Sequence, residues 1–387
     1  MKIYKILRIT TIPVSFSTLL KGQMKFMKEN GFSVLMCSSA GKEISEIKEN
    51  ECCDHTIVPL SRKINPILDL YALIKLIMII KKFKPDIVHT HTPKAGLLGI
   101  LASWLCRIPV RLHTVAGMPL METNAMGKKL LIFLERILYK MATNIYPNSI
   151  GLEKYILDNI CKDKTKIKVL GNGSSNGIDL DYFQKSDDII RKTKKLKIEY
   201  NILETDFVFL FVGRVVKDKG LNELIYSFNE LSIKYEDVKL LIVGPFENDL
   251  NPISKISLET MSINRNIIYA GFIKDVRPFY LLSNVFVFPS YREGFPNVLL
   301  QAGAMNLPSI VSDINGSNEI IKHGFNGIII PPKSSDQLYD AMEEIYTNKA
   351  ILNSLKSNFR KTIEEKFDTK ILWNLILAEY KYHLGIV

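Results

Sequence analysis

The stretch "NVFVFPSYREGFPNVLLQAG" (residues 284–303) predicts a buried strand that passes through a short polar loop into a helix. Its first seven residues are mostly apolar, as expected of a strand that is covered on both faces of a parallel sheet. Pro296 suits the first position of a helix, where no backbone N–H is needed. Arg292 and Glu293 should therefore lie at the carboxyl end of a strand, where open parallel sheets bind their ligands.

The same alternation of apolar runs and helical stretches continues through the rest of the chain. The runs predicted as strands are 3–10, 32–39, 85–91, 110–117, 144–149 and 166–173 in the first half, and 207–213, 238–244, 266–271, 284–290, 308–312 and 326–331 in the second. Continuous apolar strands that alternate with helices indicate parallel sheets covered on both faces. The sequence thus predicts an α/β fold of two facing, Rossmann-like, doubly wound domains with a cleft between them.

Domain boundaries follow from a change in composition. A polar, lysine-rich stretch at 186–205 is interpreted as a linker between an N-terminal domain (1–185) and a C-terminal domain (206–369). Residues 370–387 form an amphipathic helix that is expected to pack back against the first domain.

The net charge of +11 is unevenly distributed. Residues 1–200 carry 32 Lys+Arg against 18 Asp+Glu, whereas residues 201–387 carry 19 against 22. This basic half favours an anionic partner, such as a membrane leaflet or a lipid-linked phosphate, although solvated lysines alone would give the same count. The basic, amphipathic segment 127–142 either touches that leaflet or simply covers a sheet. Nucleic acid is not expected, because no dense Lys/Arg run with interleaved aromatic residues occurs.

Several features indicate a cytoplasmic protein on the inner face of the cell membrane. The apolar runs are too short to span a bilayer. The N-terminus is interpreted as a first strand and not a leader, because Arg8 interrupts its apolar part. The five cysteines show no metal-ligand spacing, and their odd number is typical of a reduced protein.

Two cations follow the predicted strand 207–213. Arg214 can bind phosphate oxygens in bidentate fashion, and Lys219 adds a point charge just before a helix. A salt-bridged surface loop would use the same residue types. The helix that starts near Pro296 offers free N–H groups to a diphosphate. Glu293 beside it is better explained by sugar hydroxyls than by phosphate, so the pattern indicates a nucleotide sugar.

Three motifs in the second half carry a family resemblance. "GRVVKDKG" (213–220), "PSYREGFPNVLLQA" (289–302) and "NGSNEIIKHGFNGIII" (315–330) together resemble family 4 of the retaining glycosyltransferases, which have the GT-B fold. In the first half, "HTHTPKAGLLG" (89–99) and "HTVAGMP" (113–119) are similar to members that build capsule, O-antigen and other lipid-linked glycans.

The resemblance implies roles for individual residues. Arg214 and Lys219 would bind the donor diphosphate and offset charge on the leaving nucleotide, and Glu293 would contact hydroxyls of the donor sugar. Gln301 stands where the family has a second glutamate, which binds the nucleotide ribose. The remaining implied positions are the backbone of Gly294, Phe295, Pro296 and Asn297 around sugar and phosphate, Gly271, Phe272 and Ile273 at the base, Glu319 near the diphosphate and His113 in the sugar pocket.

His89, His91 and Lys94 are candidates for the acceptor side. The two histidines are interpreted as pointing to opposite faces of a strand end, one packed and one in the cleft. A metal site is not expected there, because no carboxylate or cysteine cluster accompanies them. Lys94 at a helix start could meet an acceptor phosphate or be an ordinary surface lysine.

The implied reaction is glycosyl transfer with retention, without metal or cofactor. The expected donor is a UDP-sugar, and the expected acceptor is a polyprenyl-diphosphate-linked or growing oligosaccharide of a bacterial surface glycan. Two alternatives remain open: a non-catalytic subunit that binds nucleotide sugars, and a GT-B sugar-nucleotide epimerase.

Overall fold

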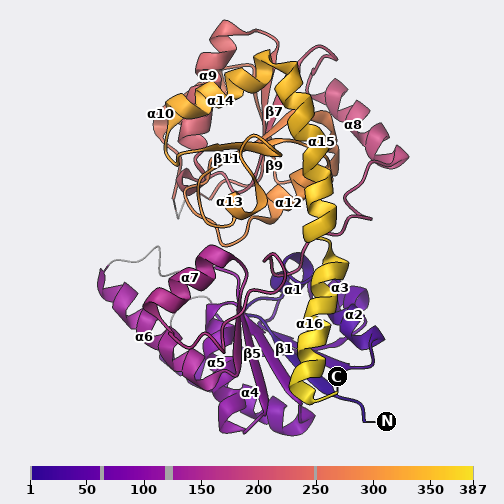
Figure 1. Ribbon diagram of the computed structural model, residues 1–387, viewed down its shortest axis with the longest axis vertical. Coiled ribbons are helices and arrows are strands. Elements are labelled where there is room, and N and C mark those ends of the chain that lie inside the picture. Colours follow the sequence, from indigo (N-terminus) through magenta and orange to yellow (C-terminus); the bar gives the residue numbers. More distant parts are fainter. Residues whose placement is uncertain (1, 62–64, 118–124, 248–250, 387) are drawn as a thin grey trace. The chain divides into compact units, whose positions relative to one another are not determined.

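The computed structural model describes residues 2–386 except 62–64, 118–124 and 248–250. The chain divides into two compact units (Figure 1). Unit 1 comprises residues 1–176 and 369–387, and unit 2 comprises residues 177–368. The chain therefore passes between the units twice, at 176–177 and at 368–369.

Unit 1 contains a six-stranded parallel sheet in the order β3-β2-β1-β4-β5-β6. Its strands are β1 (Lys5–Ile9), β2 (Ser33–Ser38), β3 (Asp54–Ile57), β4 (Ile87–His91), β5 (Val110–Val115) and β6 (Asn144–Pro147). Its helices are α1 (Val14–Thr18), α2 (Gln23–Glu29), α3 (Ile44–Glu51), α4 (Pro66–Phe83), α5 (Pro93–Leu105), α6 (Ala125–Met141), α7 (Ile150–Asn159) and α16 (Thr369–Leu384).

Unit 2 repeats this plan in the order β12-β11-β10-β7-β8-β9. Its strands are β7 (Phe207–Val212), β8 (Val238–Val243), β9 (Ile267–Gly271), β10 (Val285–Phe288), β11 (Ser309–Ser312) and β12 (Gly327–Ile330). Its helices are α8 (Asp187–Glu199), η2 (Lys217–Lys219), α9 (Leu221–Lys234), α10 (Lys255–Ile263), α11 (Arg277–Leu282), α12 (Asn297–Ala304), α13 (Ser317–Ile320), α14 (Ser335–Thr347) and α15 (Lys349–Lys366).

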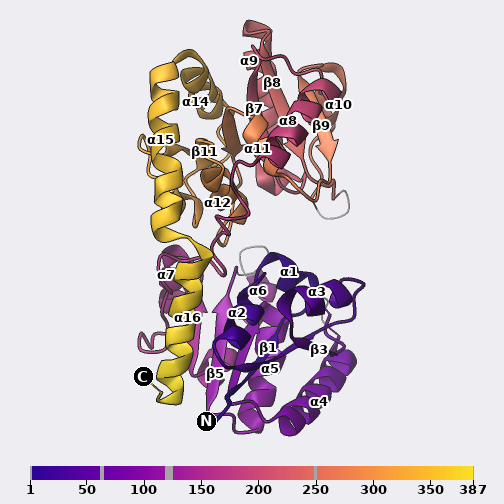
Figure 2. The same ribbon diagram turned by 90° about the vertical axis from the view of Figure 1, so that its right-hand side faces the viewer.

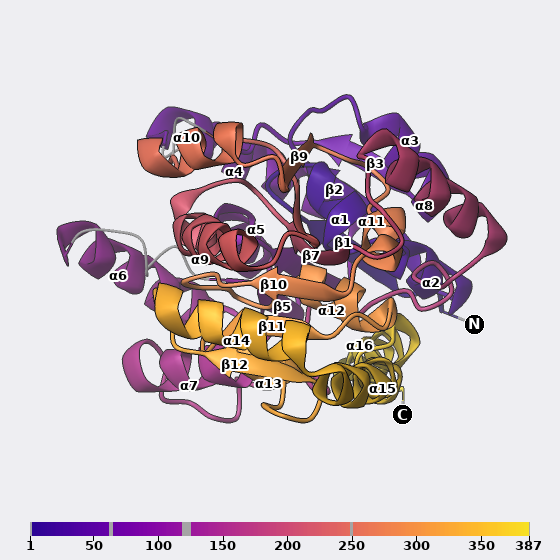
Figure 3. The ribbon, with the colours of Figure 1, turned by 90° about the horizontal axis from the view of Figure 1, so that it is seen from above.

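The helices cover both faces of each sheet. In unit 2, α9 packs against α10 and α14, whereas α8 packs against α11 and α12 against α15 (Figure 3). The apolar runs of the sequence lie in between, and every residue of β10 and β11 is buried. Both sheets are parallel throughout, so the predicted α/β fold of two doubly wound sheets is confirmed.

Residues 186–205 form part of unit 2 and are not an open linker. Ser186 caps α8 by accepting from Ile189 N, and Asp187 and Asp188 stand in the first turn, where the helix dipole favours carboxylates. Ile189 and Thr193, one turn apart, are buried against the unit. The lysines that gave this segment its linker-like composition occupy much of the remaining surface of the helix.

The segment 166–173, predicted as a strand, forms only an isolated bridge between Ile167 and Ile145. Conversely, β3 has no counterpart among the predicted strands. Its sequence, "DHTI", is an edge strand with two intermediate and two exposed residues, so it lacks an apolar run. Among the described residues, no helix is long and apolar enough to cross a bilayer.

Candidate functional site

Two loops of unit 2 meet at the carboxyl ends of β7 and β10, which are neighbours in the sheet. Lys219, on the loop 213–220, forms an ion pair with Glu293, on the loop 289–296, through Nζ and Oε1. The side chains are only 15% and 14% exposed. Ser290 Oγ donates to the same carboxylate oxygen over 2.9 Å. Two residues predicted from separate motifs thus form one contact.

A second ion pair joins the same loops, between Asp218 and Arg292. The backbone reinforces it, because Tyr291 N donates to Asp218 O over 2.8 Å. The Tyr291 hydroxyl also donates to Glu223 Oε1 over 2.6 Å. Asp218, which is not among the residues predicted from the motifs, thus holds the two loops together through its side chain.

Arg214 is more exposed than Lys219 or Arg292 on the same two loops, with half of its side chain accessible. Its Nη1 lies 2.6 Å from Glu247 Oε2. Glu247 follows β8 closely, so a search beyond every strand end could have found it. Arg214, Lys219 and Arg292 therefore each have a carboxylate partner. An incoming anion must share these cations with carboxylates that already hold them in position.

A third loop, between β11 and α13, supports the backbone at Glu293. Asn315 Nδ2 donates to Glu293 O over 3.1 Å and to Gly294 O over 2.9 Å. A Cβ at Gly316 would lie 2.6 Å from Gly294 O, so only glycine allows this approach. Glu319 follows in the first turn of α13 and is partly buried. The loop 289–296 is thus held from both sides.

Helix α12 starts at Asn297, one residue later than predicted. Pro296 is its N-cap, with an extended ψ of 102°, and Pro296 O accepts from Leu299 N over 3.0 Å. A proline with extended ψ cannot be part of the helix itself, which is why the prediction was one residue too early. The Phe295 side chain is buried with its ring centroid 5.6 Å from that of Phe367, so only its backbone remains available to a ligand.

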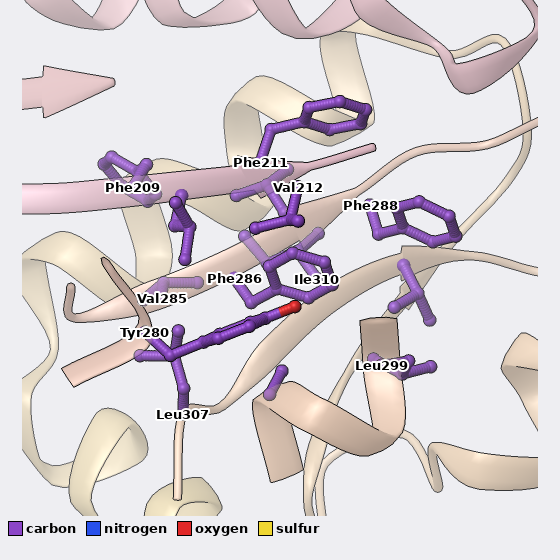
Figure 4. Close-up of a cluster of buried hydrophobic side chains, with 14 of the residues drawn as sticks. Phe209, Phe211, Val212, Tyr280, Val285, Phe286, Phe288, Leu299, Leu307 and Ile310 are labelled. Atoms are coloured by element: carbon purple, nitrogen blue, oxygen red, sulfur yellow. The ribbon is translucent and has the colours of Figure 1, made fainter. Parts of the chain in front are cut away.

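Gln301 lies on the second turn of α12 and contacts the buried Tyr280. The Tyr280 hydroxyl lies 3.0 Å from Val298 O and 3.1 Å from Gln301 Oε1. Figure 4 shows the Tyr280 ring inside the core cluster, with its oxygen directed inward. A hydroxyl donates one proton, so Tyr280 can donate to Val298 O or to Gln301 Oε1, but not to both at once. If the side-chain amide of Gln301 is turned round, its Nε2 donates to the Tyr280 oxygen and both contacts are satisfied. A glutamine can donate in this way and a glutamate cannot.

The segment predicted to hold a base follows the edge strand β9. Phe272 is 74% exposed, whereas Ile273 packs against the core of the unit. An accessible aromatic ring can stack on a flat base, whatever the identity of that base. The geometry is thus compatible with base stacking at Phe272.

His89 and His91 point to the same face of β4, and the prediction of opposite faces was wrong. Residues two apart in a strand share a face, and the imidazole rings stack with centroids 4.5 Å apart. Both are buried. Burial and the nearby Arg8 hold their pKa values well below the ordinary value, so both are neutral at physiological pH.

Arg8 is the centre of this buried network. It contacts His89 Nδ1 at 3.1 Å, His91 Nε2 at 2.7 Å, Gln23 Oε1 and the hydroxyl of Tyr380. Tyr380 lies on α16, so the network attaches the C-terminal helix to the sheet of unit 1. These contacts give His89 and His91 a packing role in the interior.

His113 lies in the second half of β5, and Lys94 lies in the first turn of α5, just after β4 ends. His113 is buried with Nδ1 2.8 Å from Thr90 Oγ1, and burial lowers its pKa to about 4. A Cβ at Gly96 would lie 2.4 Å from its Cε1, so the ring packs on the first turn of α5. Lys94 Nζ forms an ion pair with Asp69 Oδ2 at 2.7 Å. Within the motif 113–119, Met118 and Pro119 lie outside the described residues.

Two family models match the chain. "Glycosyl transferases group 1" matches residues 192–362, and "Glycosyl transferase 4-like" matches residues 8–149. Each therefore falls largely within one of the two units.

Full-length relatives agree with these matches. The chain is 35% identical over 386 residues to the capsular polysaccharide biosynthesis glycosyltransferase CapM of Staphylococcus aureus, covering 99% of this chain and 98% of that protein. It is 31% identical to the UDP-Gal:alpha-D-GlcNAc-diphosphoundecaprenol alpha-1,3-galactosyltransferase of Escherichia coli, covering 86% of this chain and 84% of that protein.

Solved structures show the same fold at lower identity. A glycosyltransferase from Rickettsia africae matches with a TM-score of 0.81 at 22% identity, covering 99% of both chains. HepE of Anabaena in complex with UDP matches with a TM-score of 0.81 at 16% identity, covering 98% of this chain and 100% of that one. The chain is a glycosyltransferase, and it belongs to the group 1, family 4-like glycosyltransferases.

Proposed function

We propose that this enzyme transfers a sugar, with retention of configuration, from a UDP-sugar to a polyprenyl-diphosphate-linked or growing oligosaccharide of a bacterial surface glycan. The observation that carries the donor side is the Lys219–Glu293 pair, which places a cation and a hydroxyl acceptor together at neighbouring strand ends. The acceptor class follows relatives from Escherichia coli and Campylobacter jejuni, whose names specify diphospho-undecaprenol substrates.

The proposed chemistry is stabilisation of a departing diphosphate. Arg214 and Lys219 supply positive charge where negative charge develops on the leaving nucleotide. Glu293 orients the sugar through its hydroxyls, while Asn315 and Gly316 hold the backbone beneath it. Preorganised charges of this kind cost no reorganisation during the reaction.

The other donor contacts follow the same edge of the sheet. We assign the ribose to Gln301, the base to the segment 271–273, and the diphosphate to the backbone of 294–297 with Glu319 nearby. In unit 1, we assign the neutral imidazole of His113 to the sugar. Lys94 is retained as a candidate acceptor contact, whereas His89 and His91 are occupied by the buried Arg8 network, which removes them from that role.

Incubation with UDP-, GDP- and TDP-sugars and a polyprenyl-diphosphate-linked acceptor tests this proposal. Formation of a glycolipid with the donor's anomeric configuration supports it. Binding without turnover, seen as a thermal shift alone, would instead indicate a binding subunit. Isomerised free nucleotide sugar would indicate an epimerase.

Arg214→Ala is expected to lower the transfer rate at least about tenfold, because one cation at the leaving group is lost. Arg191→Ala is the matched control, since Arg191 is also an exposed arginine of unit 2, 71% exposed and paired with Asp188. Initial rates at saturating donor measure both. Equal rates for the two variants would contradict the role of Arg214.

Gln301→Glu is expected to leave UDP affinity unchanged or to raise it by up to about fivefold, because a charged acceptor binds a ribose hydroxyl by about 1 kcal/mol more strongly. The new carboxylate would also compete with Val298 O for the proton of the Tyr280 hydroxyl, and this competition limits the gain in UDP affinity. Calorimetry with UDP and its 2′,3′-dideoxyribose analogue measures the effect, which should disappear with the analogue. A large loss for UDP would show that the pocket requires an amide.

We further propose that unit 1 holds the enzyme on the cytoplasmic face of the cell membrane. Unit 1 carries 28 Lys+Arg against 14 Asp+Glu, whereas unit 2 carries 23 against 26. A basic surface of this kind is attracted to anionic lipids, and the attraction weakens as salt increases. Release of the protein from membranes by high salt would support this location.

A further inference from the structure

We propose that the solvent-facing side of α4 is a docking surface for an anionic lipid bilayer. This side, here named the α4 outer face, consists of the exposed apolar residues Ile67, Leu70, Tyr71, Ile74 and Met78. Ile67 is 85% exposed and Met78 is 65% exposed. Figure 2 shows α4 at the margin of unit 1.

The α4 outer face is a continuous stripe. Leu70 and Tyr71 are adjacent and the other steps are three or four residues, so the members follow one side of a helix over about 16 Å. The opposite side, with Ala72, Leu76 and Ile80, is buried against the sheet and α5. A helix at the surface of a globular protein normally presents polar residues to water, so a second apolar side indicates a partner.

Cations occupy the end of this stripe. Lys81 and Lys82 are exposed in the last turn of α4, and Lys84 is exposed at its C-cap. Asp69 is the one carboxylate of α4, and Lys94 neutralises it at 2.7 Å. An apolar face that adjoins basic residues matches a bilayer interface, where apolar side chains enter the acyl boundary and lysines meet anionic headgroups.

Two further observations favour a bilayer over a second copy of the chain. Tyr71 lies within the stripe, and the half-exposed Trp104 lies in the last turn of α5, which packs against α4. Both residue types concentrate at membrane interfaces, because one part of each ring is apolar and the other polar. A second copy would bring the same lysines, whereas the carboxylate of α4 is already occupied.

The position of the α4 outer face suits a lipid-linked acceptor, and this step rests on the proposed function. The helix begins at the edge of the sheet where β4 ends, because Asp69 in its first turn contacts Lys94 in the first turn of α5. A bilayer at this face would hold lipid head groups beside the carboxyl edge of unit 1. The acceptor could then stay anchored while its sugar reaches that edge.

Vesicle co-sedimentation of the full chain tests the proposal, with phosphatidylcholine vesicles that contain or lack phosphatidylglycerol. The double variant Ile74→Glu/Met78→Glu should bind the anionic vesicles at least about tenfold more weakly than the wild type. The double variant Lys81→Ala/Lys82→Ala should reduce binding to anionic vesicles but not to vesicles of phosphatidylcholine alone. Because it introduces no new charge into α4, it keeps the test valid if the glutamate variant is unstable. Thermal melting checks the folding of each variant.

Two matched controls locate the effect. Ile263→Glu changes an isoleucine of unit 2 that is 77% exposed, and Phe133→Glu changes an exposed residue of α6. Both should bind like the wild type. The proposal is overturned if the wild type does not bind anionic vesicles, or if Phe133→Glu abolishes binding while the α4 variants retain it. It is also overturned if the wild type is a dimer and the α4 variants are monomers. Transfer to a water-soluble acceptor analogue is measured in parallel, so a failure of the proposed reaction is seen separately.

Discussion

Lys219→Ala is expected to lower the rate of sugar transfer at least about tenfold and to destabilise unit 2 by about 3 kcal/mol. The rate falls because the leaving diphosphate loses a cation. Stability falls because the Glu293 carboxylate, with a side chain only 14% exposed, loses its ion-pair partner. Initial rates with the donor sugar and unfolding in urea measure the two effects.

The double variant Lys219→Met/Glu293→Gln separates these effects. Replacing both charges removes the unpaired carboxylate, and Ser290 can still donate to the new amide. Most of the lost stability should return while transfer stays low. A double variant that regains the wild-type rate would show that the pair only holds the two loops together.

The strands of unit 2 were predictable because each is an apolar run between polar loops, and all six coincide with predicted strands. In unit 1 the predicted and observed strands agreed less well. The edge strand β3 pairs with β2 through its backbone, and a sequence such as "DHTI" carries no pattern that demands burial. The segment at 166–173 had an apolar pattern, yet it pairs only through Ile167. Backbone pairing at a sheet edge does not depend on side-chain hydrophobicity.

The motifs of the candidate site were proposed because ligands bind beyond the carboxyl ends of parallel strands. This rule led to Arg214, Lys219 and Glu293, but it did not reveal that the last two contact each other. That contact depends on β7 and β10 being neighbours in the sheet, although their paired residues, such as Phe209 and Val285, are 76 positions apart in sequence. The supporting residues were harder to find. Tyr280 reaches Gln301 from a buried helix position that resembles any core aromatic.

The histidines of β4 show a different kind of error. The period of a strand already places His89 and His91 on one face, so the sequence alone contradicted their separation. Their partners could not have been predicted, because Tyr380 and Arg8 are 372 residues apart in the chain. A buried arginine that contacts two neutral histidines is recognised only once the helices that surround it are placed.

Gly220→Ala is expected to be more disruptive than its size suggests. Gly220 has φ 71° and ψ 23°, a left-handed conformation that costs a residue with a Cβ about 1 kcal/mol. In addition, the new Cβ would lie 2.1 Å from Pro289 O, a backbone atom of the neighbouring loop. The two loops that carry Lys219 and Glu293 would have to separate. We expect a loss of at least about 2–3 kcal/mol in stability and at least about tenfold in UDP affinity.

Gly324→Ala isolates the backbone part of this effect. Gly324 has φ 73°, almost the same as Gly220, but no atom of the described residues lies within 4 Å of an added Cβ. The free energy of unfolding of this variant should therefore fall only by the cost of the left-handed conformation, about 1 kcal/mol, and its affinity for UDP should stay unchanged. Unfolding in urea and calorimetry with UDP compare the two variants. If they behave alike, the close approach at Pro289 does not hold the loops; if only Gly220→Ala loses UDP, the spacing between these two strand ends determines the donor site.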